Sequence, residues 1–321
     1  RGNLMEKNAL IYVAGHTGMV GSSIFRALIR KGYNNILTQN HEELDLCQQE
    51  SVDKFFRDKR PEYVFCAAAK VGGIQANETY MADFLIENLK MQNNLLESAH
   101  KYHVKKLLFF AIFCIYPKNA VQPITESQLL TGSIEPTNEG YAIAKIAGLK
   151  ACEYYKKQYG DNFICAMPAN AYGINDCFDL ANSHVIPALI MKFHEAKQNN
   201  AKNVVIRGTG KPLREFLYVD DMAEASIFLM EHYNELEFIN IGTGQEVSIE
   251  RLTEIIKNTV GYHGNISFDT TKPDGMMRRM IDSSRIFQMG WRPSISLEEG
   301  IKLEYQWFLE NIYSEKRNID G

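Results

Sequence analysis

A turn with three glycines lies between an apolar stretch and an amphipathic stretch near the start of the chain, and it restricts the fold more than any other feature. The run at 10–14 is typical of a buried strand, and the pattern at 18–31 is typical of a helix with one apolar side. Between them, Gly15 permits a tight turn, Gly18 lets the backbone approach a pyrophosphate, and Gly21 allows close packing of helix on strand. The spacing G-x-x-G-x-x-G is also compatible with a loop. Its place between this strand and this helix predicts a dinucleotide site, because the free N–H groups of the helix start suit phosphate.

Short apolar runs alternate with helical patterns through the first half of the chain. Such alternation predicts an α/β fold of the Rossmann type, with a doubly wound parallel sheet covered by helices on both faces. Ligands of such sheets bind at the carboxyl ends of the strands. The further expected strands are 35–38, 63–67, 106–110 and 163–167, and the further expected helices are 50–59, 80–102 and 141–160.

Tyr141 and Lys145 are four residues apart in an expected helix, so their side chains lie on one face of it. A free tyrosine has a pKa of about 10. A nearby cation lowers that pKa, so the pair predicts a proton donor that works near neutral pH. The alternative is an ordinary pair on a helix surface, and the spacing alone does not exclude it.

The composition excludes several other classes of protein. The chain has 321 residues and a net charge of −4, with neither a basic stripe for nucleic acid nor an apolar run long enough for a membrane span. The start of the chain lacks the apolar core of a signal peptide. The cysteines show no C-x-x-C spacing, which argues against a metal site and for a cytoplasmic enzyme with reduced thiols. They are Cys47, Cys66, Cys114, Cys152, Cys165 and Cys177.

Together with longer runs, the glycine turn and the Tyr141–Lys145 pair resemble the extended short-chain dehydrogenase/reductase family, and within it the GDP-L-fucose synthases, which are GDP-4-keto-6-deoxymannose epimerase/reductases. The resemblance covers nearly the whole chain. It implies NADP(H), a GDP-4-keto-6-deoxy sugar as substrate, a role in making surface glycans, and a homodimer joined through the helices at 80–102 and 141–160. The runs that carry it include Ala67-Ala68-Ala69-Lys70-Val71-Gly72-Gly73-Ile74, Cys114-Ile115-Tyr116-Pro117-Lys118, Asn182-Ser183-His184-Val185-Ile186-Pro187, Arg214-Glu215-Phe216-Leu217 and Lys272-Pro273-Asp274-Gly275.

The same resemblance implies two domains. The cofactor domain is expected at 5–175, and the chain returns to it at about 214–243 for a helix and a strand. The substrate domain is expected at 176–213 and 244–321. Within these parts the expected elements are a helix at 183–198, a strand at 203–207, a helix at 219–233 and a strand at 238–242.

The expected cofactor site lacks the usual determinant of cofactor choice. An acid after the second strand favours NAD and an arginine there favours NADP, yet this chain has Gln39-Asn40-His41. Thr17 also replaces an arginine that is usual in the family. NADP(H) is the first choice by resemblance, with a weaker grip on the 2′-phosphate, and dual use stays open. By resemblance the cofactor-binding residues are Gly15, Thr17, Gly18, Met19, Val20, Gly21, Gln39, Asp45, Leu46, Ala68, Ala69, Lys70, Tyr141, Lys145 and His184.

The resemblance makes Tyr141 the acid that protonates the alkoxide formed at C4, with Lys145 holding the nicotinamide ribose. The family's third catalytic group is a serine or threonine hydroxyl, and the matching position here is Ile112, followed by Phe113 instead of serine. Losing one such donor can cost about 2.7–4 kcal/mol in comparable sites. Three accounts stay open: a reductase with another donor or a water, an engineered sequence, or a weakened enzyme.

Cys114 and His184 match the base and acid that move protons at C3 and C5. A thiolate is a suitable base if a cation lowers its pKa, and histidine can supply a proton near neutral pH. The alternatives are a buried cysteine at a strand end and a histidine at a helix cap. A reductase without epimerase activity, acting on a pre-epimerised GDP-4-keto-6-deoxyheptose, therefore stays open, as does a non-catalytic dinucleotide sensor.

The substrate residues come from the resemblance as well. Asn170 matches a residue that contacts the sugar diphosphate, and Arg214 matches the arginine that binds the diphosphate through two donors. Lys192 stands in place of a phosphate-binding arginine, so it keeps the charge without the planar fork. Arg207 and Lys272 are weaker candidates, since exposed basic residues are usually only solvated.

Overall fold

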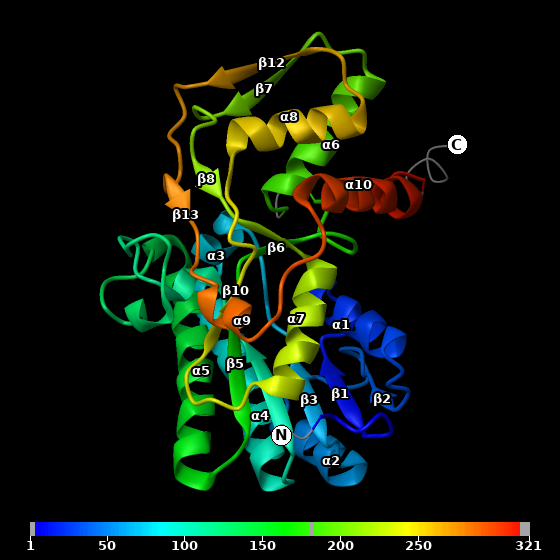
Figure 1. Ribbon diagram of the computed structural model, residues 1–321, viewed down its shortest axis with the longest axis vertical. Helices are drawn as coiled ribbons and strands as arrows, with labels where there is room; N and C mark the ends of the chain where they lie inside the picture. Colours follow the sequence, from blue (N-terminus) through cyan, green and yellow to red (C-terminus); the bar gives the residue numbers. More distant parts are fainter. Residues whose placement is uncertain (1–3, 180–182, 315–321) are drawn as a thin grey trace.

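A parallel sheet of six strands forms the centre of the computed structural model, which describes residues 4–179 and 183–314 (Figure 1). All neighbouring strands of this sheet run parallel, so the expected doubly wound α/β fold is confirmed. The edge strand is shorter than the expected 35–38, since it pairs on one side only. The strand order is β10 (Ile239–Ile241), β5 (Phe163–Pro168), β4 (Lys106–Phe110), β3 (Tyr63–Cys66), β1 (Ile11–Ala14) and β2 (Ile36–Leu37).

Helices cover both faces of the sheet, as Figure 1 shows. On one face lie α2 (Gln49–Lys59), α4 (Met81–Lys101) and α5 (Glu139–Tyr159); on the other lie α1 (Met19–Arg30) and α7 (Val219–His232). Each buries the apolar side that its periodicity predicts. Among the described helices, none is long and apolar enough to cross a membrane.

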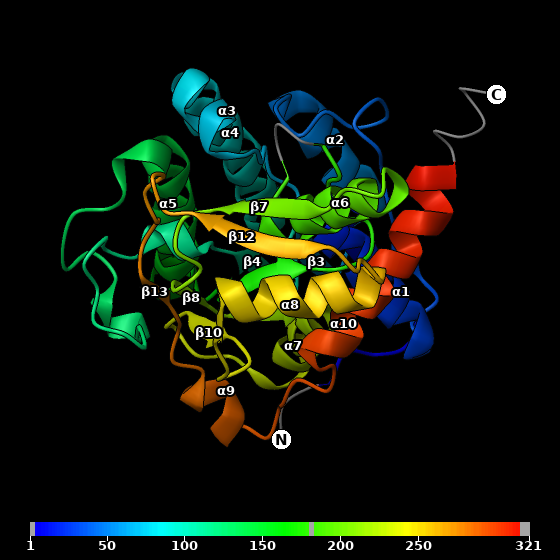
Figure 2. The same ribbon diagram turned by 90° about the horizontal axis from the view of Figure 1, so that it is seen from above.

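A smaller assembly lies above the carboxyl ends of the strands (Figures 1 and 2). Its apolar core is separate from that of the main sheet and includes Ile190, Phe193, Leu252, Ile256 and Ile301. Its elements and their neighbours are β6 (Asn170–Tyr172) paired with β9 (Phe216–Tyr218), β7 (Asn203–Arg207) paired with β12 (Asn265–Asp269), β8 (Leu213–Arg214) between β11 (Val247–Ser248) and β13 (Arg278–Arg279), and the helices α6 (Val185–Gln198), α8 (Ile249–Val260) and α10 (Leu297–Phe308).

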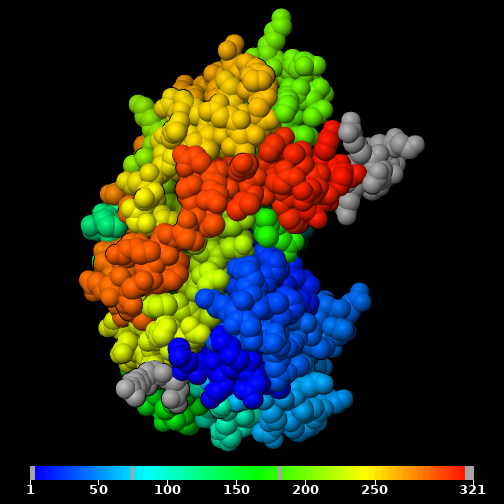
Figure 3. Space-filling model, turned by 45° about the vertical axis from the view of Figure 1, so that its right-hand side comes forward, coloured from blue at the N-terminus to red at the C-terminus, as the bar shows by residue number. Residues whose placement is uncertain are grey.

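Short elements complete the described chain. They are α3 (Ile74–Thr79), α9 (Ser284–Gln288), the 3-10 turns Phe113–Ile115, Glu126–Gln128 and Pro136–Asn138, and a π-helical turn at Leu309–Tyr313. The space-filling view shows the surface hollowed between α10 (red) and the first strand–helix unit (blue) (Figure 3).

The order of the strands reverses between β1 and β3, and this reversal locates the ligand site. β2 lies beyond β1 on one side, whereas β3, β4 and β5 follow on the other. In open α/β sheets, ligands bind outside the carboxyl ends of the strands at such a switch point. Gly15 after β1 and Ala68 after β3 meet there.

Two buried carboxyl groups lie where the smaller assembly meets the chain after β6. Glu304 belongs to the apolar side of α10, between Ile301 and Phe308, and it is fully buried. Within residues 4–179 and 183–314, neither of its oxygens has a hydrogen-bond partner, and the same holds for Oδ2 of Asp176, which lies close enough to affect Glu304. Burial raises the pKa of both groups. The native state therefore holds at least one proton here above the usual pKa of a carboxyl.

This burial predicts a pH-dependent stability. The folded pKa of Glu304 is raised, so its contribution is fully present below the unfolded pKa of about 4.3 and is lost as pH rises through the folded pKa. We expect Glu304→Gln to weaken this decline, because the amide does not ionise. Urea unfolding from pH 5 to pH 9 measures the decline in the free energy of unfolding. Each unit by which the folded pKa is raised corresponds to about 1.4 kcal/mol of that free energy.

The control is Glu299→Gln, which changes an exposed residue on the same helix and should keep the wild-type decline. Parallel pH profiles for wild type and Glu304→Gln would show that this carboxyl is not protonated in the native state.

Candidate active site

The glycine turn after β1 is shaped by close backbone contacts. Gly15 has a φ of +82°, and a Cβ at this position would lie 2.6 Å from the backbone nitrogen of Ala68. At Gly21 a Cβ would lie 2.1 Å from the carbonyl oxygen of Gly15. Gly18 caps α1 without a side-chain hydrogen bond, and the buried Nδ1 of His16 has no partner in the part of the chain that the structure describes. Open N–H groups and an unpaired imidazole nitrogen fit a bound pyrophosphate.

The other residues expected around a cofactor lie at the same edge of the sheet. Thr17 is exposed, and its carbonyl accepts a hydrogen bond of 2.9 Å from Asn175. Lys70 follows β3 and forms an ion pair of 2.7 Å with Glu87. Leu46 is buried in the main core, which matches the alternative role of a core residue. Met19 and Val20 begin α1, Gln39 follows β2, Asp45 precedes α2, and Ala69 follows β3.

Tyr141 and Lys145 extend from the first two turns of α5 toward the end of β4. The Nζ of Lys145 lies 5.9 Å from the centre of the Tyr141 ring and 4.7 Å from that of Phe109. Gly148 makes this close packing possible, since a Cβ there would lie 2.4 Å from the Phe109 ring. The side chain of Lys145 is thus buried, whereas that of Tyr141 is half-buried.

The expected lowering of the Tyr141 pKa is not found. Burial raises the pKa of its phenol, and the neighbouring Cys114 adds to the rise. Burial also lowers the pKa of Lys145 to about 8, and the nearby thiols offset part of this effect. The reason is that the ammonium faces the aromatic ring and is itself desolvated, so it stabilises the phenolate little. Tyr141 is consequently a neutral phenol, which is the form that donates a proton.

Cys114 lies in the 3-10 turn after β4, next to both Lys145 and Arg279. Burial raises the pKa of its thiol to about 12, although the two cations oppose that rise. The condition for a thiolate base, a pKa lowered by a nearby cation, is therefore not met, because desolvation outweighs the two cations. The guanidinium of Arg279 also stacks on Phe113, with 4.6 Å from Cζ to the ring centre.

Arg279 is a site residue that the sequence analysis did not identify. β13 pairs in parallel with β8 so that Arg279 is in register with Arg214. Burial lowers the pKa of Arg214 to about 10, and the like charge of Arg279 adds to that fall. Burial also lowers the pKa of Arg279, while Cys114 and Glu135 oppose the change. The buried Nε of Arg279 has no partner in the described chain. Such a pair of guanidinium groups is ready for an anion with several oxygens.

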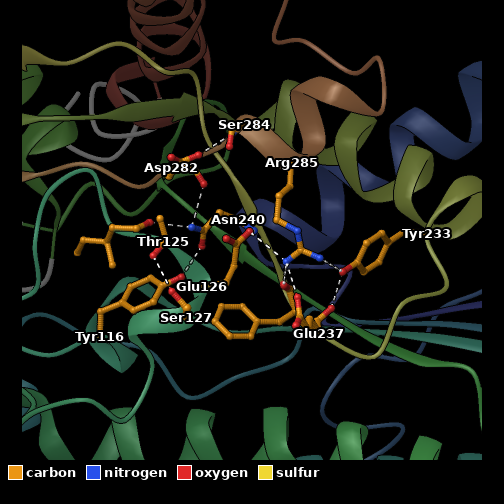
Figure 4. A network of polar contacts seen from close by, with 12 residues as sticks. Tyr116, Thr125, Glu126, Ser127, Tyr233, Glu237, Asn240, Asp282, Ser284 and Arg285 are labelled. Carbon is orange, nitrogen blue, oxygen red and sulfur yellow. Dashed lines mark hydrogen bonds and ion pairs between the residues drawn. The ribbon is translucent and has the colours of Figure 1, made fainter.

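A buried polar network anchors the wall that carries Cys114 (Figure 4). The hydroxyl of Tyr116 donates to Asn240 Oδ1 at 2.5 Å, and Asn240 Nδ2 donates to the carbonyls of Ile124 and Asp282, each at 3.0 Å. Glu126 accepts from the backbone N–H of Asn240 at 3.0 Å. The network joins β10, the turn after β4 and the segment after β13. Its rigidity fixes Cys114 and the neighbouring apolar residues relative to the sheet.

Of the remaining predicted residues, Asn170 lies beside Arg214, whereas the others have no described contact with Arg214 or Cys114. Asn170 Nδ2 donates to the carbonyl of Glu215 at 3.0 Å, which places it beside Arg214. His184 caps α6, is exposed, and lies near Asp176; no described contact joins it to Cys114. Lys192 is exposed and donates to the carbonyl of Val205, and both Arg207 and Lys272 are exposed, so no described contact joins these three to Arg214. Asn182, in a run that carried the resemblance, lies outside the described residues.

Known proteins resemble the chain over nearly its full length. The model of the NAD dependent epimerase/dehydratase family matches residues 11–242. A putative GDP-L-fucose synthase 2 from Arabidopsis thaliana is 54% identical over 98% of the chain and 96% of the relative. The structure of a GDP-mannoheptose C4 reductase from Campylobacter jejuni with NADP bound is 38% identical, with a TM-score of 0.87 and coverage of 95% and 99%. A GDP-L-fucose synthetase from Naegleria fowleri bound to NADP is 29% identical, with a TM-score of 0.91 and coverage of 98% and 96%.

The paired guanidinium groups predict an anion site that can be measured with pyrophosphate. We expect Arg279→Gln to weaken pyrophosphate binding about tenfold to a hundredfold, which corresponds to a charge-assisted hydrogen bond of about 1.5–3 kcal/mol. Isothermal titration gives the dissociation constants. The matched control is Arg278→Gln, because Arg278 is the neighbour on the same strand and is engaged with Glu246 at 2.7 Å. Equal losses in the two variants would contradict the site.

Proposed function

The chain belongs to the NAD dependent epimerase/dehydratase family, and we propose that it reduces the C4 ketone of a GDP-4-keto-6-deoxy sugar with NADP(H). The observation that carries the proposal is the proximity of four groups to one another. Arg279 is in register with Arg214, which suits the diphosphate, and it lies close enough to Cys114 to affect the pKa of that thiol. Cys114 in turn lies close enough to Tyr141 to affect the pKa of its phenol. A substrate with a diphosphate at one end and a ketone at the other matches the order in which these groups lie in space.

A reduced dinucleotide held by its pyrophosphate at the glycine turn would supply the hydride. Tyr141 then donates its proton to the oxygen that becomes an alkoxide, and its raised pKa keeps that proton in place until charge develops. Lys145 favours the negative charge that the phenol gains, and its own pKa of about 8 leaves it mainly protonated at neutral pH. Ile112, at the start of the 3-10 turn, offers no hydroxyl, so Tyr141 carries more of the stabilisation than in a site with two donors.

The proposal also covers the domains, the oligomeric state and the cellular compartment of the protein. We propose a cofactor domain at 5–175 and about 214–243 and a substrate domain at 176–213 and 244–321, and the presence of two separate apolar cores supports two domains. The cores cross the proposed boundaries in two places: Ile281, Ile286 and Trp291 pack in the main core, and Tyr172, Phe216 and Tyr218 pack in the smaller one. A homodimer is proposed through α4 and α5, which expose Ile86, Ile143 and Tyr154. The six free thiols suit the reducing cytoplasm.

One observation favours the narrower function of a C4 reductase without epimerase activity. A thiol with a pKa of about 12 is a poor base at neutral pH, and His184 has no described contact with Cys114. A GDP-4-keto-6-deoxyheptose that has already been epimerised is then the alternative substrate. The solved GDP-mannoheptose C4 reductase supports this alternative through its own substrate.

The acid role of Tyr141 predicts the effect of its removal. We expect Tyr141→Phe to lower kcat for ketone reduction by about 10²–10⁴-fold, the usual contribution of a general acid. Binding of the reduced nucleotide should survive. The matched control is Tyr154→Phe on the same helix, since this ring is 57% exposed and should leave turnover intact. Near-normal turnover of the Tyr141→Phe variant would contradict the acid role.

Deuterium exchange separates the two substrate hypotheses. The 4-keto GDP-sugar is incubated with the protein in D₂O without reductant, and label at C3 and C5 is followed by NMR. If Cys114 is the base, label appears slowly at pH 7 and faster toward pH 9, because the thiolate fraction grows about tenfold per pH unit below its pKa. Cys114→Ala then abolishes it. If the protein reduces a pre-epimerised ketone and no label enters C3 or C5, the activity is that of a C4 reductase without epimerase activity.

A further inference from the structure

The segment after β2 is acidic at the place where this fold binds the adenosine ribose. The stretch from 38 to 46 contains Glu42, Glu43 and Asp45 but no lysine or arginine. His41 is the remaining titratable group, and its Nδ1 lies 4.0 Å from Asp45 Oδ1. A 2′-phosphate adds about two negative charges to the ribose, whereas NADH has a hydroxyl there. The charge of this segment therefore opposes the phosphate.

Local hydrogen bonds hold one of these carboxylates at the tip of the strand. The backbone N–H of Asn40 donates to Glu43 Oε2 at 2.9 Å, and the backbone N–H of Glu43 donates to Asn40 Oδ1 at 2.9 Å. This reciprocal pair is the arrangement of a capping box. Because both bonds keep Glu43 next to the end of β2, rotation away from a bound phosphate would require breaking one of them.

Two basic side chains on neighbouring elements are already engaged in ion pairs. Lys70, after β3, pairs with Glu87 at 2.7 Å, and Arg26 of α1 pairs with Asp220 at 3.3 Å. The glycine turn presents Thr17, whose backbone carbonyl is fixed by Asn175. The pyrophosphate part of the cofactor therefore fits the turn well, whereas the 2′-phosphate meets no fixed cation in the segments around Thr17 and Gln39.

We infer that this chain discriminates little between NADPH and NADH. The two positions that would hold a cation for the 2′-phosphate are occupied by Thr17 and Gln39, which carry no charge. The inference rests on the proposed function for the location of the nucleotide. It goes beyond it by assigning cofactor choice to these two side chains and to the carboxylate of Glu43. Glu43 lies beyond the Gln39-Asn40-His41 tip, so its carboxylate opposes the 2′-phosphate without being the tip acid that favours NAD.

Calorimetric titration of the full chain tests the inference without catalysis. The probes are NADPH, NADH and 2′,5′-ADP, which carries the 2′-phosphate but no nicotinamide. We expect the dissociation constants of NADPH and NADH to differ by less than tenfold, and 2′,5′-ADP to bind no more than tenfold tighter than 5′-AMP. A preference for NADPH above tenfold overturns the inference. If neither dinucleotide binds, the proposed function fails instead.

A gain of charge provides the second test. The double substitution Thr17→Arg with Gln39→Arg should raise the ratio of the NADH to the NADPH dissociation constant at least tenfold, and the gain should shrink with added salt. The matched control is Thr17→Gln with Gln39→Met, which adds length without charge and should leave the ratio as in wild type. An unchanged ratio in the arginine variant places the 2′-position elsewhere and overturns the assignment.

Discussion

The contact between the backbones of Gly15 and Ala68 is the constraint on which the rest of the structure depends. It joins the ends of β1 and β3, where the order of the parallel strands reverses. A side chain at Gly15 or Gly21 would enter backbone atoms, so α1 could not begin directly at the sheet edge. With α1 in place, the open N–H groups of its first turn and the ends of three neighbouring strands face one cleft. The smaller assembly then covers that cleft from above (Figure 1).

Burial, more than charge, sets the chemistry of the groups in the cleft. Lys145 lies close to Cys66, Cys114, Cys152 and Cys165, and desolvation lowers its pKa by more than these neighbours raise it. The result is an amine with a lowered pKa beside a phenol with a raised one. Both groups are thus close to the protonation states that reduction needs, since the acid must keep its proton and the cation must respond to charge that appears only during the reaction.

The fold was largely predictable from the sequence, because the strands of the main sheet are continuous apolar runs with helices between them. β4 and β7 begin and end at the predicted residues. Arg279 was not predictable from its pattern, since a strand of two residues has no alternation to show which side chain faces the site. The direction of the Tyr141 pKa was predicted wrongly for a related reason. Spacing along a helix places a cation nearby, but it does not reveal how deeply the phenol and the amine are buried.

The pairing of Arg214 with Arg279 shows why such residues are hard to find from sequence and yet decisive for function. Two half-buried guanidinium groups in register cost free energy, because both are desolvated and their like charges repel. Glu215, directly after β8, accepts hydrogen bonds from the backbone N–H groups of Thr243, Gly244 and Ile281, and so ties the segments at 243–244 and 281 to the end of that strand. An anion bound between the two groups would offset their repulsion. In the proposed diphosphate site, the free energy that the fold spends on holding the two groups in register would therefore contribute to affinity for the diphosphate.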